Sequence, residues 1–501
     1  MGYKIILTSD RTLMSEYNNN EFLGFAACAP NFLPDFLYKS LFCPSVPCHN
    51  GIPAFANCGT RKIEAVLLEN GFDKNEVVVA HPEHLAKVIS KDTKVVGITT
   101  NDPLGLGPAS STFSSLTSRE TYTAFYFRKL VTNKLIRKYN LKIIVGGPGV
   151  WQLEDERIRA KLDIDCIVVG EGEIIAHQLF RKAINGEELP KIVHGDIVPV
   201  DKIPTIKNAT VNGLVEISRG CGRGCRFCNP TMAQIRYQSL EKILEEVKVN
   251  VWTQRKRGVI LHAEDVLRYK ANGFIPNEEE VLKLFTEVRK ITPDIGISHF
   301  ALASVVAKPD LIKHLSEFLG VGSSTLPWYS GQAGIETGSP ELAHAHLAGK
   351  AKPFDVRDWP NIVREAFQIL KDNKWVPCGT LIMGAPGETN EDVTKTKALV
   401  EDLIEYKSLI VPLFFVPIGN LSNEKFFTAK DMTSEHWKLF AACWRHNLRW
   451  FEPLITEHFK MRRISRPKRT AVQVLKRYAE WRIDPYLRVM EEGKNPLRVA
   501  G

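Results

Sequence analysis

The sequence lacks a long apolar run. Its longest apolar stretches, such as residues 409–418, fall far short of the roughly 20 residues that cross a bilayer, and we expect no membrane span. The first eight residues, Met1-Gly-Tyr-Lys-Ile-Ile-Leu-Thr, follow a short strand pattern without the apolar core and cleavage site of a leader peptide. No internal repeat and no low-complexity segment stands out. These absences predict a globular protein of the cytoplasm.

A strong excess of charge of one sign is also absent. The net charge is +9 over 501 residues, with 25% charged and 44% hydrophobic residues, as in ordinary globular proteins. Basic residues gather at 445–449 and 461–469, a pattern typical of a solvated helix face. A surface for an acidic partner or for nucleic acid is the alternative, and we expect no nucleic-acid partner.

The pattern of apolar residues divides the chain into four predicted segments. Residues 1–70 form an extension rich in Cys and Pro, and residues 71–200 alternate short apolar strands with helices, which is typical of a parallel sheet covered on both faces. Residues 205–420 repeat a strand–helix pattern six times, fewer than the eight units of a full TIM barrel, and residues 421–501 are mainly helical. The expected barrel strands lie at 213–218, 258–262, 295–301, 332–336, 378–383 and 409–416. The predicted fold class is therefore α/β: a doubly wound Rossmann-like domain, a partial (β/α)6 barrel and a mainly helical C-terminal segment.

A compact cysteine motif follows the first expected barrel strand. Cys221, Cys225 and Cys228 have the spacing Cys-x3-Cys-x2-Cys, and the glycines among them permit tight turns, so one loop can direct three thiolates at a single metal cluster. Three thiolates leave one iron of a [4Fe–4S] cluster open, whereas electron carriers fill all four positions. A zinc site, for which no fourth ligand lies close in sequence, and free thiols are the alternatives. We predict that the three cysteines are the metal-binding and catalytic residues.

Here the chain resembles the radical S-adenosylmethionine (SAM) superfamily, over about residues 210–420. In that family the open iron chelates SAM, whose reductive cleavage gives a 5′-deoxyadenosyl radical. The resemblance implies four groups of SAM contacts. They are Phe227 beside the adenine; Glu264 and Asp265 near the SAM amino group; Gly334, Glu336 and Thr337 of a Gly-Ile-Glu-Thr-Gly-Ser strand end; and Gly384 and Pro386 of a Gly-x-Pro-Gly-Glu-Thr turn.

Small and polar residues gather at three strand ends of the first domain, where parallel sheets bind ligands. A nicotinamide site is disfavoured because Gly-x-Gly-x-x-Gly is absent. These strand ends resemble the cobalamin-binding domain that precedes the barrel in cobalamin-dependent radical SAM enzymes, the class B radical SAM methyltransferases. The resemblance implies cobalamin contacts at Thr99, Thr100, Asn101, Asp102, Gly105, Gly107, Ser110, Gly146, Gly147, Pro148, Gly170, Glu171 and Gly172. The family's common lack of Asp-x-His-x-x-Gly is shared here, so no protein histidine is expected beneath the cobalt. A domain that keeps the fold but binds no corrinoid is the alternative.

Four further cysteines lie in the N-terminal extension. Cys28, Cys43, Cys48 and Cys58, with His49 beside them, could hold a second cluster or a single iron or zinc, although their spacing matches no common motif. The alternative is that they are buried small hydrophobic residues. Packing roles are expected for Cys166, Cys378 and Cys443.

The resemblance implies C-methylation of an unactivated sp3 carbon with methylcobalamin as the methyl donor. Non-methylating rearrangement or cyclisation, and an Fe–S electron-transfer or binding protein, are the alternatives. Residues 13–25 and 101–108 are similar to archaeal methylases that modify methyl-coenzyme M reductase, and among these to glutamine C-methyltransferases. This implies a protein or peptide substrate, and the reductive chemistry implies an electron donor of the flavodoxin or ferredoxin type.

Overall fold

The computed structural model describes residues 2–17, 21–229, 232–252, 258–461 and 466–496. Residues 18–20 of the N-terminal stretch and 462–465 of the basic stretch, both singled out above, lie outside the described residues. The described chain forms two compact units. The first comprises residues 1–217, 236–261 and 286–295, and the second comprises residues 218–235, 262–285 and 296–501.

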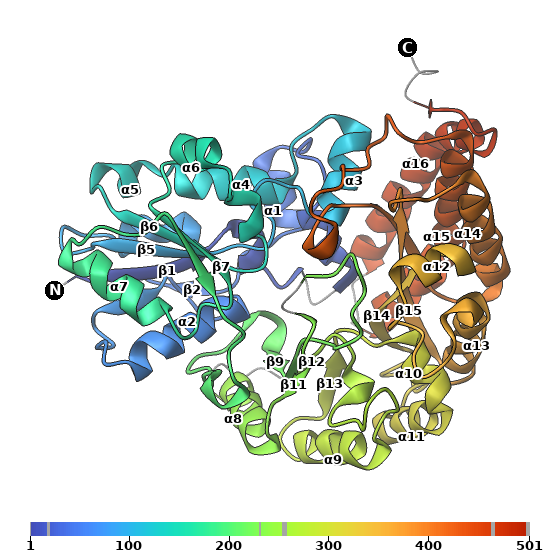
Figure 1. Ribbon diagram of the computed structural model, residues 1–501, viewed down its shortest axis with the longest axis horizontal. Coiled ribbons are helices and arrows are strands. Elements are labelled where there is room, and N and C mark those ends of the chain that lie inside the picture. Colours follow the sequence, from blue (N-terminus) through green and yellow to red (C-terminus); the bar gives the residue numbers. More distant parts are fainter. Residues whose placement is uncertain (1, 18–20, 230–231, 253–257, 462–465, 497–501) are drawn as a thin grey trace. The chain divides into compact units, whose positions relative to one another are not determined.

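The first unit is built on a six-stranded sheet with the order β4-β1-β5-β6-β7-β8, in which every adjacent pair is parallel (Figure 1). Its strands are β1 (Ile5–Ser9), β4 (Val77–Val79), β5 (Val95–Thr99), β6 (Lys142–Gly146), β7 (Cys166–Gly170) and β8 (Ile192–Gly195). The direction of the strand order reverses between β1 and β5, because the chain first adds β4 on one side of β1 and then β5 on the other. Ligands of such sheets bind at this switch point, beyond the carboxyl ends of the strands.

Alternating residues of these strands supply two cores, one on each face of the sheet. Ile6, Val96 and Ile143 pack on one face against helices α4 (Tyr122–Val131), α5 (Lys134–Lys138) and α6 (Glu156–Leu162). Ile5 and Val95 pack on the other face against α2 (Cys58–Glu69) and α7 (Ala176–Asn185), and Figure 1 shows these helices on opposite sides of the sheet. Because a side chain changes face at every residue along a strand, apolar runs without alternation are what such a sheet requires. The predicted doubly wound sheet is confirmed.

Three expected details of this unit were wrong. The sequence pattern predicts one long helix over about 119–139, but the structure has α4 and α5 there, because the Asn133 side chain accepts a hydrogen bond from the Leu135 N–H and begins a new helix. The pattern also predicts a helix over 84–90, where the structure has the 3-10 segment Pro82–Lys87. The strand β1, assigned to an extension at 1–70, lies inside the sheet between β4 and β5. The sheet therefore begins about seventy residues before the predicted limit of 71–200.

The barrel strands form two groups of three, and the pairs of the second group are parallel. One sheet has the order β13-β12-β9, and the other has the order β14-β15-β16. A bridge between His299, after β13, and Gln332, in β14, lies between the two groups in strand order. The strands are β9 (Leu214–Glu216), β12 (Gly258–His262), β13 (Asp294–Ile297), β14 (Tyr329–Glu336), β15 (Trp375–Met383) and β16 (Leu409–Phe414). Each matches one of the six expected positions, so the partial barrel is confirmed, while the limits 205–420 and 421–501 stay predictions.

Helices follow the barrel strands and make up the C-terminal segment. Those after the first strands are α8 (Leu240–Trp252), α9 (Glu278–Arg289), α10 (Leu302–Ala307) and α11 (Pro309–Leu319). The later ones are α12 (Pro340–His346), α13 (Trp359–Asp372), α14 (Asn390–Asp402), α15 (Ser434–Met461) and α16 (Arg466–Glu491). Among the described residues, none of the helices combines the length and apolar character needed to span a bilayer.

Candidate functional site

The three cysteines of the motif lie on one glycine-rich loop of the second unit. The backbone N–H groups of Cys221 and Gly222 both donate to the Met232 carbonyl at 3.0 Å, which closes the loop. A Cβ atom on Gly220 would lie 2.1 Å from the Gln234 carbonyl oxygen, so only glycine fits there. All three loop glycines are left-handed, with φ angles of 78° at Gly220, 67° at Gly222 and 69° at Gly224. The turns expected from the sequence are present.

The cysteine thiols are held close enough to influence one another's charge. Burial, together with the nearby Cys221, Glu264 and Cys225, raises the pKa of Cys228 to about 12. Burial likewise raises the pKa of Cys225. Without a partner Cys225 and Cys228 are therefore poor thiolates at neutral pH, whereas cationic iron would favour the charged form. Three soft thiols on one loop fit the donor set of an iron–sulfur cluster.

Arg223 anchors the loop from within. Its guanidinium donates to the carbonyl oxygens of Lys350 and Lys352, both at 2.9 Å, and to the carboxylate of Asp265 at 3.1 Å. The Arg223 and Asp265 side chains are only 4% and 1% exposed. Asp265 also accepts from the Ser304 hydroxyl at 2.7 Å, so its carboxylate is fully engaged. Of the two acidic residues predicted to meet SAM, only Glu264 is exposed.

A pocket with an empty volume of about 300 Å³, its open mouth included, lies beside this loop. Four segments that are separate in the sequence form its walls. They are the cysteine loop, the carboxyl end of β14, α12, and the end of β15 with the chain that follows β15 and β16. The lining residues are Phe227, Glu336, Thr337, Leu342, His346, Leu347, Ile382, Ala385, Phe415 and Leu421. Of the residues predicted to contact SAM, Phe227, Glu336 and Thr337 line this pocket.

The strand end at Glu336 is unusual in its backbone and its partner. Glu336 has a positive φ of 64°, an uncommon angle for a non-glycine residue. Its carboxylate accepts a hydrogen bond of 2.5 Å from the Lys350 ammonium, and a Cβ on Gly334 would collide with both groups. Burial alone would lower the pKa of Lys350, but Glu336 and Cys225 raise it above its ordinary value. Lys350, which the sequence reading missed, therefore places a positive charge beside a cysteine.

The turn after β15 is fixed by a chain of hydrogen bonds. The Gly384 N–H donates to Glu388 at 2.6 Å, and Glu388 is also in contact with the His436 ring at 2.8 Å. The ring of His346 lies 2.7 Å from the carbonyl oxygen of Pro386, which ties α12 to the turn. Gly384 has a φ of 78° and no room for a side chain, since a Cβ would lie 2.0 Å from the Phe427 ring. This turn presents its backbone, with Ala385, to the pocket.

Residues 215–400 match the Radical SAM superfamily. The chain carries a radical SAM domain. The match includes the cysteine loop, the Glu336 strand end and the turn after β15, so it covers every group of residues that lines the pocket except those after β16. The predicted resemblance to this superfamily is confirmed for residues 215–400.

Three proteins to which the chain is similar show the range of this superfamily. An uncharacterized methyltransferase of Pyrococcus horikoshii is 24% identical over 361 residues, which cover 65% of this chain and 68% of that protein. A putative methylthiotransferase of Methanocaldococcus jannaschii is 25% identical over 293 residues, 54% of this chain and 59% of that protein. The radical SAM methyltransferase TsrM of Kitasatospora setae, solved with cobalamin and a [4Fe-4S] cluster bound, is 13% identical with a TM-score of 0.46, over 84% of this chain and 77% of that one.

The second predicted site lies outside the radical SAM domain, where strands of the first unit end. Because β1, β5, β6 and β7 are parallel, the residues after them share one edge of the sheet. The hydroxyls of Ser9 and Thr100 and one carboxylate oxygen of Asp10 are buried there without a hydrogen-bond partner among the described residues. Buried polar atoms are rarely left unpaired. An edge that offers such atoms fits a polar ligand rich in amide groups, as a corrinoid is.

Several residues predicted to contact cobalamin instead hold the loops in place. Asp102 accepts hydrogen bonds from the Gly107 N–H at 2.9 Å and from the Gln152 amide at 2.7 Å. Glu171 forms a buried ion pair with Arg236 at 2.5 Å. Gly147 has a φ of 108°, and its Cβ would lie 2.5 Å from the Thr100 carbonyl oxygen, so the packing of neighbouring loops explains this glycine without a ligand.

Two polar residues at this edge were missed by the sequence reading. Asp10 follows β1, and Cys28 of the N-terminal stretch interacts with the Ser110 hydroxyl. Burial, together with Asp102 and Asp10, raises the pKa of Cys28 to about 12 against the hydrogen bond with Ser110. Neither residue belongs to a sequence motif. Only the folding of the chain around the sheet places them beside the predicted loop.

Replacing Asp10 by Asn is expected to stabilise the protein in neutral but not in acidic solution. Burial raises the pKa of Asp10 from 3.8 to about 6, against hydrogen bonds from Thr12. Between these values the folded state holds the proton that the unfolded chain releases, so stability falls as the pH rises to 6 and then stays level. At pH 8 the Asp10→Asn variant should gain up to about 3 kcal/mol over the wild type, and near pH 4 almost nothing. Urea unfolding at both pH values tests this, and the exposed Asp73→Asn controls for the change in charge.

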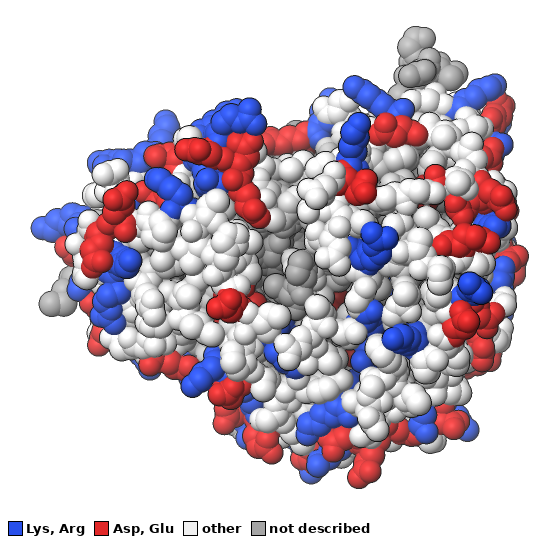
Figure 2. Space-filling model, viewed as in Figure 1, with Lys and Arg blue, Asp and Glu red and all other residues white. Residues whose placement is uncertain are grey.

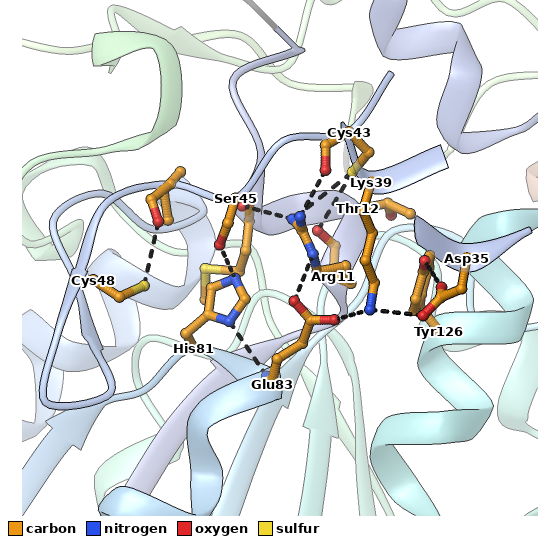
Figure 3. Close-up of polar contacts among 12 residues, drawn as sticks. Arg11, Thr12, Asp35, Lys39, Cys43, Ser45, Cys48, His81, Glu83 and Tyr126 are labelled. Atoms are coloured by element: carbon orange, nitrogen blue, oxygen red, sulfur yellow. Dashed lines mark hydrogen bonds and ion pairs between the residues drawn. The ribbon is translucent and has the colours of Figure 1, made fainter. Parts of the chain in front are cut away.

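The four N-terminal cysteines do not come together in the structure. Cys43 is buried beside Arg11, whose guanidinium donates to the Cys43 carbonyl at 2.6 Å and pairs with Glu83 at 3.0 Å (Figure 3). Cys28 lies by Ser110 and Cys58 begins α2. Of the two alternatives left open for these cysteines, a single metal centre held by all four is not formed among the described residues, while the packing roles of Cys166, Cys378 and Cys443 agree with their burial.

Charges are mixed on the surface. On the face shown in Figure 2, basic and acidic side chains alternate around the rim of both units rather than gathering by sign. Many of the basic residues near the C-terminus are paired within the protein, as Arg445 is with Asp484 at 2.9 Å and Arg449 is with Glu405 at 2.7 Å. The basic cluster at 445–449 thus has the character of a solvated, ion-paired helix face.

Proposed function

We propose that this protein is a cobalamin-dependent radical SAM methyltransferase that transfers a methyl group to an unactivated sp3 carbon. The observation that carries the proposal is the convergence of separate motifs on one pocket: the cysteine loop with Phe227, the strand end at Glu336, and the turn at Ala385. An Fe–S protein that only carries electrons would have no use for a pocket at the open side of its cluster.

The residues of the second unit divide into ligands and supports. Cys221, Cys225 and Cys228 would hold the cluster, and Phe227, Gly334, Glu336, Thr337, Gly384 and Pro386 would surround SAM. Glu264, which is exposed and close to Cys228, is the candidate for the SAM amino group, while Asp265 positions Arg223. The cluster and SAM supply the reductive cleavage that no side chain here can perform. The protein's part is to hold the reacting groups in line and to exclude water.

The first unit would hold cobalamin at the edge formed by β1, β5, β6 and β7. Asn101, Pro148 and Gly170 are exposed at this edge and would face the ligand. Ser9, Asp10 and Thr100 would complete their hydrogen bonds with it or with ordered water. Asp102 and Glu171 would support the loops through the contacts described above.

The finer proposal concerns the substrate and the electron source. The resemblance of residues 13–25 and 101–108 to methylases of methyl-coenzyme M reductase supports a glutamine side chain of that protein as the methyl acceptor. A flavodoxin or ferredoxin would supply the electrons. Because the chain spans 68% and 59% of the lengths of its two relatives above, the substrate is proposed from these segments and not from those proteins.

The experiment that tests the proposal measures two products at once. The reconstituted protein is reduced anaerobically with SAM, with and without methylcobalamin, and 5′-deoxyadenosine and S-adenosylhomocysteine are quantified. Methyl transfer through cobalamin predicts both products, with S-adenosylhomocysteine dependent on added cobalamin. Deoxyadenosine alone, in the presence of a peptide that contains the acceptor glutamine, would favour a non-methylating reaction.

A further inference from the structure

A cysteine and two histidines from distant parts of the first unit meet at one point. The ligand atoms of Cys48, His81 and His84 all lie within 4.8 Å of one another. Among the described residues, this is the one group of three or more Cys, His, Asp or Glu side chains so arranged. The cysteine loop of the radical SAM domain is not part of it.

We propose that Cys48, His81 and His84 form a zinc site, distinct from the cluster and made of residues that are not among the predicted cobalamin contacts. One thiolate and two imidazoles are ligands that zinc prefers, and three protein ligands leave a fourth tetrahedral position to water. In such a site the ligand atoms lie about 3.4–3.6 Å apart, as follows from Zn–S and Zn–N bonds of about 2.3 and 2.0–2.1 Å. Small side-chain rotations therefore suffice to close the group around an ion.

The local backbone explains why the two histidines share a side. His81 is the N-cap of the 3-10 segment Pro82–Lys87, and the His84 N–H donates to the His81 carbonyl at 2.9 Å, a turn that leaves the two ring centroids 5.2 Å apart. Cys48 comes from the short hairpin of β2 (Cys48–His49) and β3 (Ile52–Pro53). The His81 N–H donates to the carbonyl oxygen of Gly51 at 2.9 Å, so the hairpin turn is already fixed against the histidine segment.

The contacts of the three side chains leave them available for an ion. The ring of His81 is buried and lies 3.0 Å from the Ser45 hydroxyl and 3.3 Å from the Glu83 N–H (Figure 3). Cys48 donates weakly to the Val46 carbonyl at 3.3 Å. An ion at Nδ1 of His81 would replace the contact with the Glu83 N–H, while the Nε2–H still donates to the Ser45 hydroxyl, as the second nitrogen of a ligating imidazole usually does.

Nearby charges are balanced without these ligands. Arg11 pairs with Glu83 at 3.0 Å, and Glu83 is also bound by Lys39, which pairs with Asp35 at 2.7 Å (Figure 3). Glu83 is thus occupied by two cations and is not the fourth ligand. The ion would join the N-terminal hairpin to the segment after β4, at the carboxyl end of the sheet, and so stabilise a stretch that has little regular structure.

The test uses the full-length chain with Cys221, Cys225 and Cys228 replaced by alanine, so that cluster iron and the proposed reaction play no part. After growth with zinc and gel filtration, metal content is measured by mass spectrometry. We expect about one zinc per chain, at most about a tenth of that in Cys48→Ser and in His84→Asn, and full retention in His49→Ala, whose exposed ring adjoins Cys48 but lies outside the group. A chain without zinc, or zinc unchanged by Cys48→Ser, overturns the proposal.

The absorption spectrum of bound cobalt(II) tests the site in the parent chain, so this test does not depend on whether the Cys48 and His84 variants fold. Cobalt(II) added to the same alanine-substituted chain should give a thiolate-to-cobalt charge-transfer band in the near ultraviolet, together with visible bands of a four-coordinate ion. The His49→Ala chain should give the same spectrum. Absence of the charge-transfer band in the parent chain, whose Cys48 is intact, excludes the site whatever the variants do.

Discussion

Replacing Cys221, Cys225 and Cys228 together by alanine is expected to abolish reductive cleavage of SAM. The three thiols are the proposed cluster ligands on a loop that its glycines shape and Arg223 anchors. Without the cluster no group in the pocket can deliver an electron to SAM, so 5′-deoxyadenosine should fall at least about 1000-fold, the scale of losing a catalytic unit as a whole. The measurement is product formed per chain after anaerobic reconstitution and reduction.

The control for this prediction removes a single cysteine that lies outside the cysteine loop. The Cys58→Ala variant, changed at the start of α2 in the first unit, should bind as much iron and sulfide as the wild type and form as much 5′-deoxyadenosine. Product formation by the triple variant at wild-type rates would show that the cluster is bound elsewhere.

Replacing Arg223 by Met is expected to destabilise the second unit strongly. The substitution removes the hydrogen bonds to the carbonyl oxygens of Lys350 and Lys352 and leaves Asp265 buried without its cation. Breaking one side of a buried pair costs about 3–5 kcal/mol. Urea unfolding should show this loss, and cluster incorporation should fall with it because the cysteine loop loses its anchor.

Arg226→Met on the same loop is the matched control. Arg226 is exposed, so its loss should change the free energy of unfolding by less than about 0.5 kcal/mol and leave iron content intact. Equal effects of the two substitutions would mean that the loss of stability and of iron comes from removing a positive charge near the cluster and not from losing the buried contacts of Arg223.

Apolar patterning was enough to predict most of the fold. Short runs such as 95–99 and 142–146 signal strands buried on both faces, and the cysteine spacing located the radical SAM domain. The strand β1 was placed outside the sheet because its partners, β4 and β5, follow it by about seventy residues or more. A local sequence pattern can identify a strand but does not show which strands pair across such a separation in sequence.

The candidate sites were predictable only where residues are close in sequence. The loop at 221–228 could be found from its cysteine spacing, and the Glu336 strand end from its resemblance to a family motif. Lys350, which meets Glu336 and Cys225, carries no motif, and the group of Cys48 with His81 and His84 joins segments about thirty residues apart. Likewise, nothing local distinguishes Asp265, which binds Arg223, from Glu264, which is exposed.

The central claim is that the three cysteines hold a [4Fe–4S] cluster with one iron open to SAM in the pocket beside Phe227. Electron paramagnetic resonance of the reduced, reconstituted protein, recorded before and after SAM is added, tests it most directly. The account predicts the signal of a reduced [4Fe–4S] cluster whose g values change when SAM binds. A signal that SAM leaves unchanged, or one that persists when all three cysteines are replaced by alanine, would contradict it.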